Sequence, residues 1–200
     1  MKDKCFKKLD LPCVILCGGK SSRMGFDKCF LKFQETDLIH FQYQQKAEIF
    51  EKVYLSVKED KFQNEFKNLI FDECEDKTEF NPMLALFSIL KQFHNIFVFI
   101  LCVDMPNVGL KEILQLQNAL DDEKIVYAKT PKHEHFLCGF YHSSLANLCL
   151  DFVKKKEYKI QALLKETKHK SVAFENELCF ANLNYYKDYE DWKNQHSKPF

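Results

Sequence analysis

Strand-like and helix-like segments alternate along the 200 residues, and this alternation predicts an α/β fold: a three-layer single domain with a mostly parallel sheet. Two runs, Cys13–Cys17 and Ile96–Val103, are apolar without interruption, as is typical of strands buried on both faces. Glycines end the first run, and Asp104-Met105-Pro106 ends the second. We expect one domain over residues 1–200, with a core at about 12–193 behind a short polar leader at 1–11.

The predicted strands are short apolar or β-branched runs that lie between polar and turn-forming residues. They are Cys13–Cys17, Val53–Val57, Asn68–Asp72, Ile96–Val103, Ile125–Ala128, Phe136–Tyr141 and Ser171–Phe174. The predicted helices show apolar residues at intervals of three or four. They are Asp37–Phe50, Met83–Phe93, Leu110–Leu120, Ser143–Lys156 and Lys159–Lys165, with a last helical turn or two ending at Trp192. The polar stretch Lys58–Lys67 is compatible with a helix or a loop.

The composition excludes several classes of protein. The net charge is zero, so no general attraction to nucleic acid or to an anionic membrane is expected. No apolar run approaches the roughly 18 residues of a membrane span, and no apolar segment of a signal peptide follows the N-terminal lysines. The nine cysteines are scattered without a C-x-x-C pair, which indicates reduced thiols and a cytoplasmic protein. The pair His133-x-His135 indicates a loop or strand edge rather than a metal site.

The segment Gly18–Lys28 follows the first strand and concentrates two rare residue types. Three of the five glycines lie in it, and its Arg23 is the only arginine of the chain. Glycine lets backbone N–H groups approach a ligand closely, and arginine and lysine bind phosphate oxygens. Asp104 follows another strand, at the sheet edge where ligands bind in α/β proteins. Cations and amides beside a carboxylate predict a site for a nucleoside triphosphate with Mg²⁺.

Two common nucleotide-binding motifs are absent. The P-loop pattern G-x-x-x-x-G-K-[ST] fails because Phe-Asp-Lys follows Gly25, and G-x-G-x-x-G is also missing. The pattern present is L-x-G-G-x-[ST]-x-R-M-G-x-D-K-x-x-L, over Leu16–Leu31. It resembles the sugar-nucleotide-type nucleotidyltransferases, and Asp104-Met105-Pro106 is similar to the metal-binding D-x-P of that superfamily. The resemblance implies a Rossmann-like nucleotidyltransferase fold.

Within this superfamily the chain resembles the molybdenum cofactor guanylyltransferases (MobA-type proteins) over roughly residues 12–193. Four further stretches match family motifs: Asp72 at a strand end, Asn81–Ala85 at a helix start, His135–Tyr141 in a strand and Phe180–Asn184 near the end. Three positions depart from the family pattern: Cys17 replaces alanine, Phe136 replaces proline and Tyr185-Tyr186 replaces Thr-Pro.

The resemblance implies a role for each matching residue. Arg23, Lys28 and Asp104 would be catalytic, with Asp104 as the ligand of the expected cofactor, Mg²⁺. The residues implied in nucleotide binding are Leu16, Cys17, Gly18, Gly19, Lys28, Ser56, Asp72 and Asp104. Among these, Asp72 would accept hydrogen bonds from N1–H and the 2-amino group of guanine. Asn182 and Asn184 would lie on the pterin side.

The implied reaction transfers GMP from GTP to the terminal phosphate of molybdopterin and releases pyrophosphate. GTP and molybdopterin are therefore the expected partners, with molybdoenzyme acceptors or their chaperones as candidate protein partners and no nucleic acid or membrane. Two alternatives stay open. A cytidylyl- or uridylyltransferase acting on a sugar or polyol phosphate would show the same opening motif, and a non-catalytic nucleotide-binding module would show the same fold.

Overall fold

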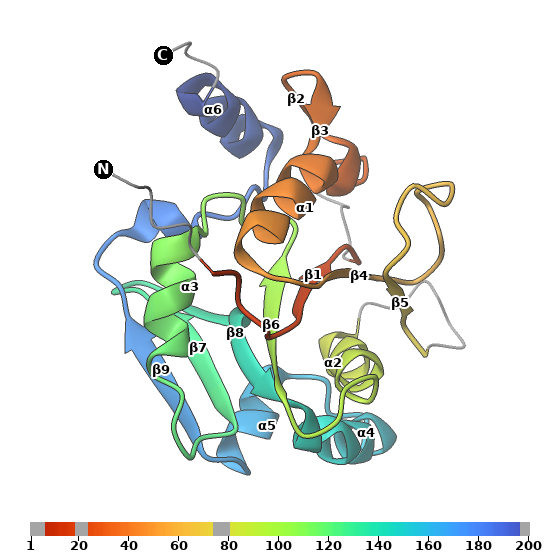
Figure 1. Ribbon diagram of the computed structural model, residues 1–200, viewed down its shortest axis with the longest axis vertical. Coiled ribbons are helices and arrows are strands. Elements are labelled where there is room, and N and C mark those ends of the chain that lie inside the picture. The colour runs from red at the N-terminus through yellow and green to blue at the C-terminus, as the bar shows by residue number, and fades with distance from the viewer. Residues whose placement is uncertain (1–6, 19–23, 74–80, 197–200) are drawn as a thin grey trace.

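A seven-stranded sheet forms the centre of the structure, a computed structural model that describes residues 7–18, 24–73 and 81–196 (Figure 1). The strand order is β5-β4-β1-β6-β8-β7-β9. The strands are β1 (Cys13–Leu16), β4 (Val53–Val57), β5 (Leu69–Phe71), β6 (Phe97–Cys102), β7 (Ile125–Lys129), β8 (Glu134–His142) and β9 (His169–Ala173). Every strand predicted from the sequence is present, with ends shifted by at most a few residues.

Most strand pairs are parallel, which confirms the predicted α/β fold. β1 pairs in parallel with β4 and β6, β4 with β5, and β7 with β9. β8 is the exception, since it runs antiparallel to both β6 and β7. The connection between β7 and β8 comprises only residues 130–133. A link this short joins antiparallel neighbours, because a parallel crossover needs a dozen residues or more.

The helices cover both faces of the sheet. They are α1 (Leu38–Ile49), α2 (Pro82–Leu90), α3 (Leu110–Gln117), α4 (Ala146–Lys154), α5 (Ile160–Lys165) and α6 (Tyr186–His196). Buried residues of α1, α3 and α6 belong to one apolar cluster, and those of α2, α4 and α5 belong to a second. In Figure 1, α1 and α6 accordingly lie on the opposite side of the central strands from α2 and α4.

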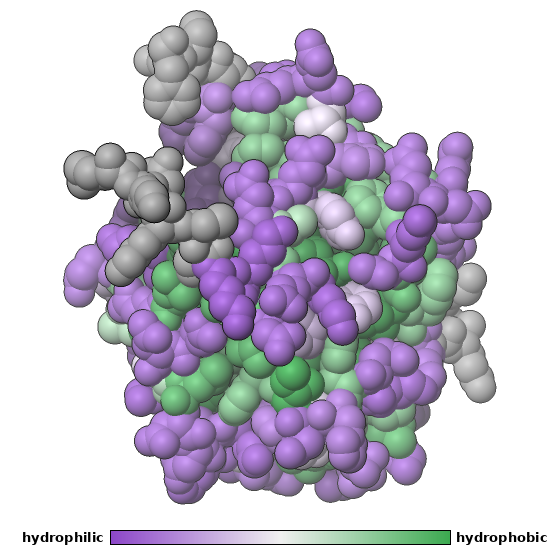
Figure 2. All heavy atoms as spheres, viewed as in Figure 1, coloured by the Kyte–Doolittle hydropathy of each residue, from purple (hydrophilic) through white to green (hydrophobic). Residues whose placement is uncertain are grey.

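The strand β1 shows how the sequence builds these three layers. Its side chains alternate between the clusters: Cys13 and Ile15 belong to the first, Val14 and Leu16 to the second. Both faces of the strand are therefore buried, which is why its sequence is apolar without interruption. Figure 2 shows the molecular surface from the same side as Figure 1: hydrophilic side chains are spread over it, with smaller hydrophobic patches between them.

Residues 58–67, for which the sequence left a helix and a loop open, form bends and turns. Other elements differ from the sequence prediction. The final helix α6 is longer than predicted, and buries Tyr189 and Trp192 at a spacing of three. A small hairpin of β2 (Lys32–Phe33) and β3 (Thr36–Asp37) was not predicted, because two-residue strands leave no periodic signal. Among the described residues, no helix combines the length and the apolar composition that a membrane-spanning segment needs.

A bulge in β8 shapes the region that faces the site. Tyr127 of β7 pairs with Gly139, but the next residue, Ala128, pairs with His135. The residues of β8 between these pairs therefore have no partner on β7. A Cβ atom at Gly139 would lie 2.2 Å from the carbonyl oxygen of Val126, so the bulge requires glycine there.

Lys46 of α1 is fully buried, which gives a prediction about stability. Its Nζ lies 3.5 Å from Oε1 of Gln45, and burial lowers the pKa of its ammonium group to about 8. Below that pH the folded protein holds a desolvated charge, a cost of about 3 kcal/mol at 1.4 kcal/mol per pKa unit. We therefore expect Lys46→Met to raise the free energy of unfolding at pH 7 by up to about 3 kcal/mol.

The sign follows from the protons that each state binds. Between pH 8 and 10.5 the unfolded chain keeps the Lys46 proton that the folded protein has lost, so wild-type stability rises with pH there. The advantage of Lys46→Met should thus shrink as the pH rises through this window. Urea unfolding at pH 7 and pH 10 measures it, with exposed Lys67→Met as the control. An advantage that is equal at both pH values contradicts the prediction.

Candidate active site

Two neighbouring cavities lie at the carboxyl ends of β1, β4 and β6, the edge at which the sequence predicts the site. The narrow cavity is lined by Leu16, Gly18, Ser56, Lys58 and Asp72, among others. The wide cavity, about 530 Å³ in volume, is lined by residues of β8, α5 and the segment before α6. Pro82, Cys102 and Leu137 line both. The cavities thus share a wall, and ligands in them would lie side by side.

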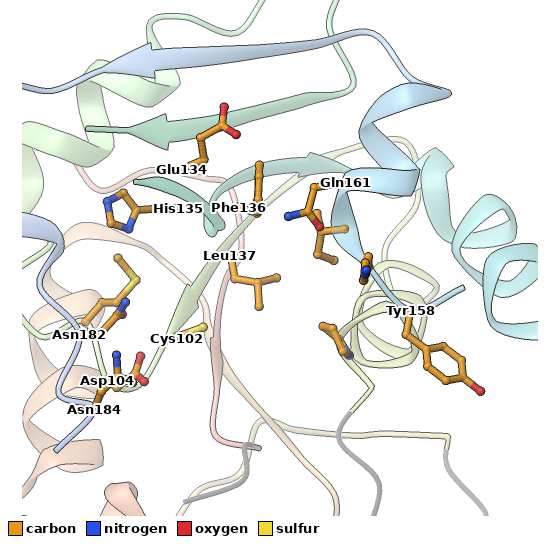
Figure 3. Close-up of a pocket in the computed structure, with 14 residues that line it drawn as sticks. Cys102, Asp104, Glu134, His135, Phe136, Leu137, Tyr158, Gln161, Asn182 and Asn184 are labelled. Atoms are coloured by element: carbon orange, nitrogen blue, oxygen red, sulfur yellow. The ribbon is translucent and has the colours of Figure 1, made fainter. Parts of the chain in front are cut away.

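The wide cavity has two polar ends and an apolar middle (Figure 3). Asp104, Asn182 and Asn184 lie together at one end, and Tyr158 and Gln161 lie at the other. The middle is formed by the side chains that β8 contributes at its bulge, Phe136 and Leu137, together with Cys102.

A lysine and two oxygen-bearing side chains meet at the first of these ends. The Nζ atom of Lys28 lies 2.7 Å from Oδ2 of Asp104 and 3.2 Å from Oδ1 of Asn184. Both charged side chains are largely buried, with 14% of Lys28 and 20% of Asp104 exposed. The backbone N–H of Leu183 donates to the carbonyl of Asp104 over 2.9 Å, which ties the segment before α6 to the end of β6. Lys28, which the sequence predicts to be catalytic, is therefore in direct contact with Asn184, which it predicts to lie on the pterin side.

Asp27 and Lys61 hold Lys28 in this position. Asp27 caps the short 3₁₀ helix Lys28–Phe30, since its Oδ1 accepts from the N–H of Cys29 at 3.0 Å. Its other oxygen accepts from Nζ of Lys61, which also donates to the carbonyl of Cys17 at 2.8 Å. Lys61 joins both ends of the glycine-rich segment. The sequence analysis missed it, because one lysine in a polar stretch has no distinguishing pattern.

Asp72 and Ser56 meet in the narrow cavity. The Ser56 hydroxyl donates to Oδ1 of Asp72 at 3.1 Å. Burial raises the pKa of the Asp72 carboxyl above its ordinary value, against the hydrogen bond from Ser56 and the charge of Lys58, which lower it. A Cβ atom at Gly18 would lie 3.9 Å from Oδ2 of Asp72, so this glycine borders the carboxylate directly.

Both backbone polar groups of Cys17 are hydrogen-bonded within the protein. Its N–H donates to the carbonyl of Ser56 over 2.9 Å, and its carbonyl accepts from Lys61. Leu16 and Gly18, on either side, line the narrow cavity. Of the remaining predicted site residues, Gly19 and Arg23 lie outside the described residues, and their roles stay predictions.

His135 lies in the wall of the wide cavity, and its contacts are structural. Its ring stacks on Phe180, with 5.0 Å between ring centroids, and its Nε2 lies 3.2 Å from Oγ1 of Thr130. Burial lowers the pKa of its imidazole, which favours the neutral ring. As expected from the sequence, it lies in a strand, β8, and His133 lies in the preceding turn.

Comparison with known proteins identifies the family. Residues 13–172 match the family of the MobA-like NTP transferase domain. A molybdenum cofactor guanylyltransferase of Campylobacter jejuni subsp. doylei is 54% identical over 187 residues, which cover 93% of this chain and 97% of that protein. The chain belongs to the molybdenum cofactor guanylyltransferases. The family resemblance inferred from the sequence motifs is thus confirmed, and the protein is a nucleotidyltransferase of molybdenum cofactor biosynthesis.

More distant relatives agree. A molybdenum cofactor guanylyltransferase of Helicobacter pylori (strain 26695) is 28% identical, covering 90% of each chain. The crystal structure of molybdopterin-guanine dinucleotide biosynthesis protein A from Archaeoglobus fulgidus superposes with a TM-score of 0.79, covering 94% of this chain and all of that one. At 16% identity it shows the shared fold alone.

The site of this guanylyltransferase has donors that suit Mg²⁺. This ion prefers oxygen ligands and is commonly held by one or two carboxylates together with substrate phosphates. Asp104 supplies a carboxylate beside the amide oxygens of Asn182 and Asn184, at one end of the wide cavity. The other carboxylate lining that cavity, Glu134, accepts from the Tyr127 hydroxyl at 3.0 Å and lies 3.6 Å from Lys129. Both carboxylates have a cationic neighbour, since Asp104 pairs with Lys28. Only Asp104 of the two lies beside the side-chain amides of Asn182 and Asn184, so its surroundings suit the metal better.

Proposed function

We propose that this guanylyltransferase transfers GMP from GTP to the terminal phosphate of molybdopterin, with the guanine base of GTP at the narrow cavity and molybdopterin in the wide one. The observation that supports this assignment is the wall shared by the cavities, with Lys28 and Asp104 close to it. A transfer between two substrates requires such an arrangement, because the reacting phosphates must approach each other.

The chemistry of the narrow cavity suits a guanine base. The ionised carboxylate of Asp72 can accept from both N1–H and the 2-amino group, a pair of neighbouring donors that cytosine and uracil lack. Ser56 fixes one oxygen of this carboxylate, and Gly18 leaves room beside the other. The base would then lie near β4 and β5, with its phosphates directed toward Lys28.

In the reaction, a terminal phosphate oxygen of molybdopterin attacks the α-phosphorus of GTP in line. The bond from that phosphorus to the bridging oxygen of the β-phosphate breaks, and pyrophosphate leaves. Lys28 would stabilise the negative charge that develops, assisted by Arg23. Asp104 would hold Mg²⁺, which supplies a Lewis acid for the phosphate oxygens. Asn184, which accepts from Lys28, would keep its ammonium group directed into the site.

The wide cavity suits an acceptor with a phosphate at one end and a flat ring system beyond it. Asn182 and Asn184 would bind near the acceptor phosphate, and Phe136 and Leu137 offer an apolar surface for the ring system. The aromatic Phe136, which departs from the family's proline, widens this surface. That molybdoenzymes or their chaperones receive the product in the cytoplasm stays a prediction.

Calorimetric titration of GTP, CTP, UTP and ATP, each with Mg²⁺, tests the donor assignment. GTP is expected to bind more tightly than the other three, and its preference should decrease in Asp72→Ala. A preference for CTP or UTP would instead support a transferase acting on a sugar or polyol phosphate. Failure to release pyrophosphate from GTP in the presence of molybdopterin would contradict catalysis.

The raised pKa of Asp72 predicts how binding and stability depend on pH. Because only the carboxylate accepts two hydrogen bonds, GTP affinity should fall as the pH falls through this raised pKa. The same shift means that ionised Asp72 destabilises the fold above that pKa, a cost that disappears at lower pH. Asp72→Asn keeps an oxygen for Ser56, so we expect a higher Tm at pH 8, a smaller gain at pH 4, close to the ordinary carboxyl pKa of 3.8, and weaker GTP binding.

Thermal unfolding and GTP titration of the Asp72→Asn variant at the two pH values measure both effects. The exposed residue Asp121 provides a control, since Asp121→Asn should leave GTP binding unchanged. A lower Tm for Asp72→Asn at pH 8, or GTP binding as tight as in the wild type, contradicts the prediction.

A further inference from the structure

Lys58 lies in the narrow cavity beside the proposed guanine site. It follows the last residue of β4, Val57, and lines the cavity together with Ser56 and Asp72. Because side chains alternate along a strand, Ser56 and Lys58 share a face, whereas Val57 packs into the opposite apolar cluster. Lys58 is half-buried and is one of the residues that line the cavity.

The charge of Lys58 acts at this cavity. Its positive charge lowers the pKa of Asp72, against the effect of burial, so the two side chains are close enough to interact electrostatically. The cavity therefore combines a cationic hydrogen-bond donor with an anionic acceptor. A ligand that fits it needs an acceptor and a donor on neighbouring positions of one edge.

Guanine has such an edge. Its O6 accepts a hydrogen bond, and the adjacent N1–H and 2-amino groups donate. Adenine has the reverse order at the first two positions, with an amino group at C6 and an acceptor at N1. We infer that Lys58 is a specificity-determining residue of this enzyme, which donates to O6 of guanine while Asp72 accepts from N1–H and the 2-amino group. This inference rests on the proposed placement of the guanine base at the narrow cavity.

The two contacts can be tested separately with two GTP analogues. In 6-thio-GTP, sulfur replaces O6 and accepts hydrogen bonds weakly, whereas N1–H and the 2-amino group remain. In ITP the 2-amino group is missing, whereas O6 and N1–H remain. A hydrogen bond from a charged donor corresponds to about tenfold in affinity, so the wild type should bind GTP about tenfold more tightly than 6-thio-GTP.

Calorimetric titration of Lys58→Met with GTP, 6-thio-GTP and ITP makes the test. The ratio of GTP to 6-thio-GTP affinity should fall to about one, and the ratio of GTP to ITP affinity should stay at its wild-type value. Asp72→Asn should show the converse, with loss of the GTP preference over ITP alone. Lys58→Arg, which keeps a charged donor, should retain most of the preference over 6-thio-GTP, and exposed Lys67→Met should change neither ratio.

Other results would overturn the inference. If Lys58→Met weakens GTP and 6-thio-GTP equally, Lys58 does not bind O6 and acts through its charge alone. If the wild type binds 6-thio-GTP as tightly as GTP, no group of the protein donates a hydrogen bond to O6. Failure of the proposed function looks different: the wild-type protein would then prefer CTP or UTP to GTP.

Discussion

Replacement of Asp104 by Asn is expected to reduce GMP transfer by about 10³-fold or more, at every Mg²⁺ concentration. In the wild type, Nζ of Lys28 lies 2.7 Å from Oδ2 of Asp104. The Asn side chain has the same shape as Asp, so its amide oxygen can still accept this hydrogen bond. It lacks the negative charge with which the Asp104 carboxylate would attract Mg²⁺. It also leaves the largely buried ammonium group of Lys28 without its ion-pair partner.

The measurement is the initial rate of pyrophosphate release from GTP and molybdopterin over a range of Mg²⁺ concentrations. Glu134→Gln is the matched control, because Glu134 also lines the wide cavity but is paired with Tyr127 and Lys129. The control should keep the wild-type metal dependence. If Asp104→Asn also keeps it, another carboxylate holds the metal.

The strands of the sheet were predicted well from the sequence, because a strand that is buried on both faces consists of apolar residues without interruption. β1 sends alternate side chains into two separate apolar clusters, so it contains apolar residues only. The helix α2 was predicted for an equally local reason. Asn81 caps it through a 3.0 Å bond to the N–H of Leu84, and Pro82 occupies a first-turn position that needs no donor.

The direction of β8 could not be read from apolar patterning, because a buried strand looks alike in either direction. The available signal was the length of the connection, residues 130–133, which is too short for a parallel crossover. This detail affects the site. The antiparallel β8 and its bulge bring Phe136 and Leu137 into the wall of the wide cavity.

The candidate site shows the same division between local and distant information. The motifs singled out Lys28, Asp104 and Asn184 separately. In the sequence, Lys28 is 76 positions from Asp104 and 156 positions from Asn184. Their contact arises only because the ends of β1 and β6 are neighbours in the sheet and α6 returns to them. Lys58 and Lys61 belong to no motif, and their positions became evident only from what they contact.

Lys28→Ala is the second change with a large expected effect, a loss of about 10²–10³-fold in turnover. The Nζ atom of Lys28 is the cationic group that the structure places against Asp104 and Asn184, where the two substrate phosphates are proposed to meet. Asp27 and Lys61 hold the backbone of this segment, so a shortened side chain should remove the charge without moving the loop.

Turnover and GTP affinity should then respond differently. If Lys28 acts mainly on the charge that develops as pyrophosphate leaves, kcat falls far more than the affinity for GTP, since only the transition state loses an interaction. Single-turnover rates and calorimetric titration of the same variant distinguish the two. Exposed Lys32→Ala, a few residues away in β2, should leave both unchanged. Near wild-type turnover in Lys28→Ala would remove Lys28 from the reaction, and an equal loss of affinity and rate would make it a binding residue for the triphosphate.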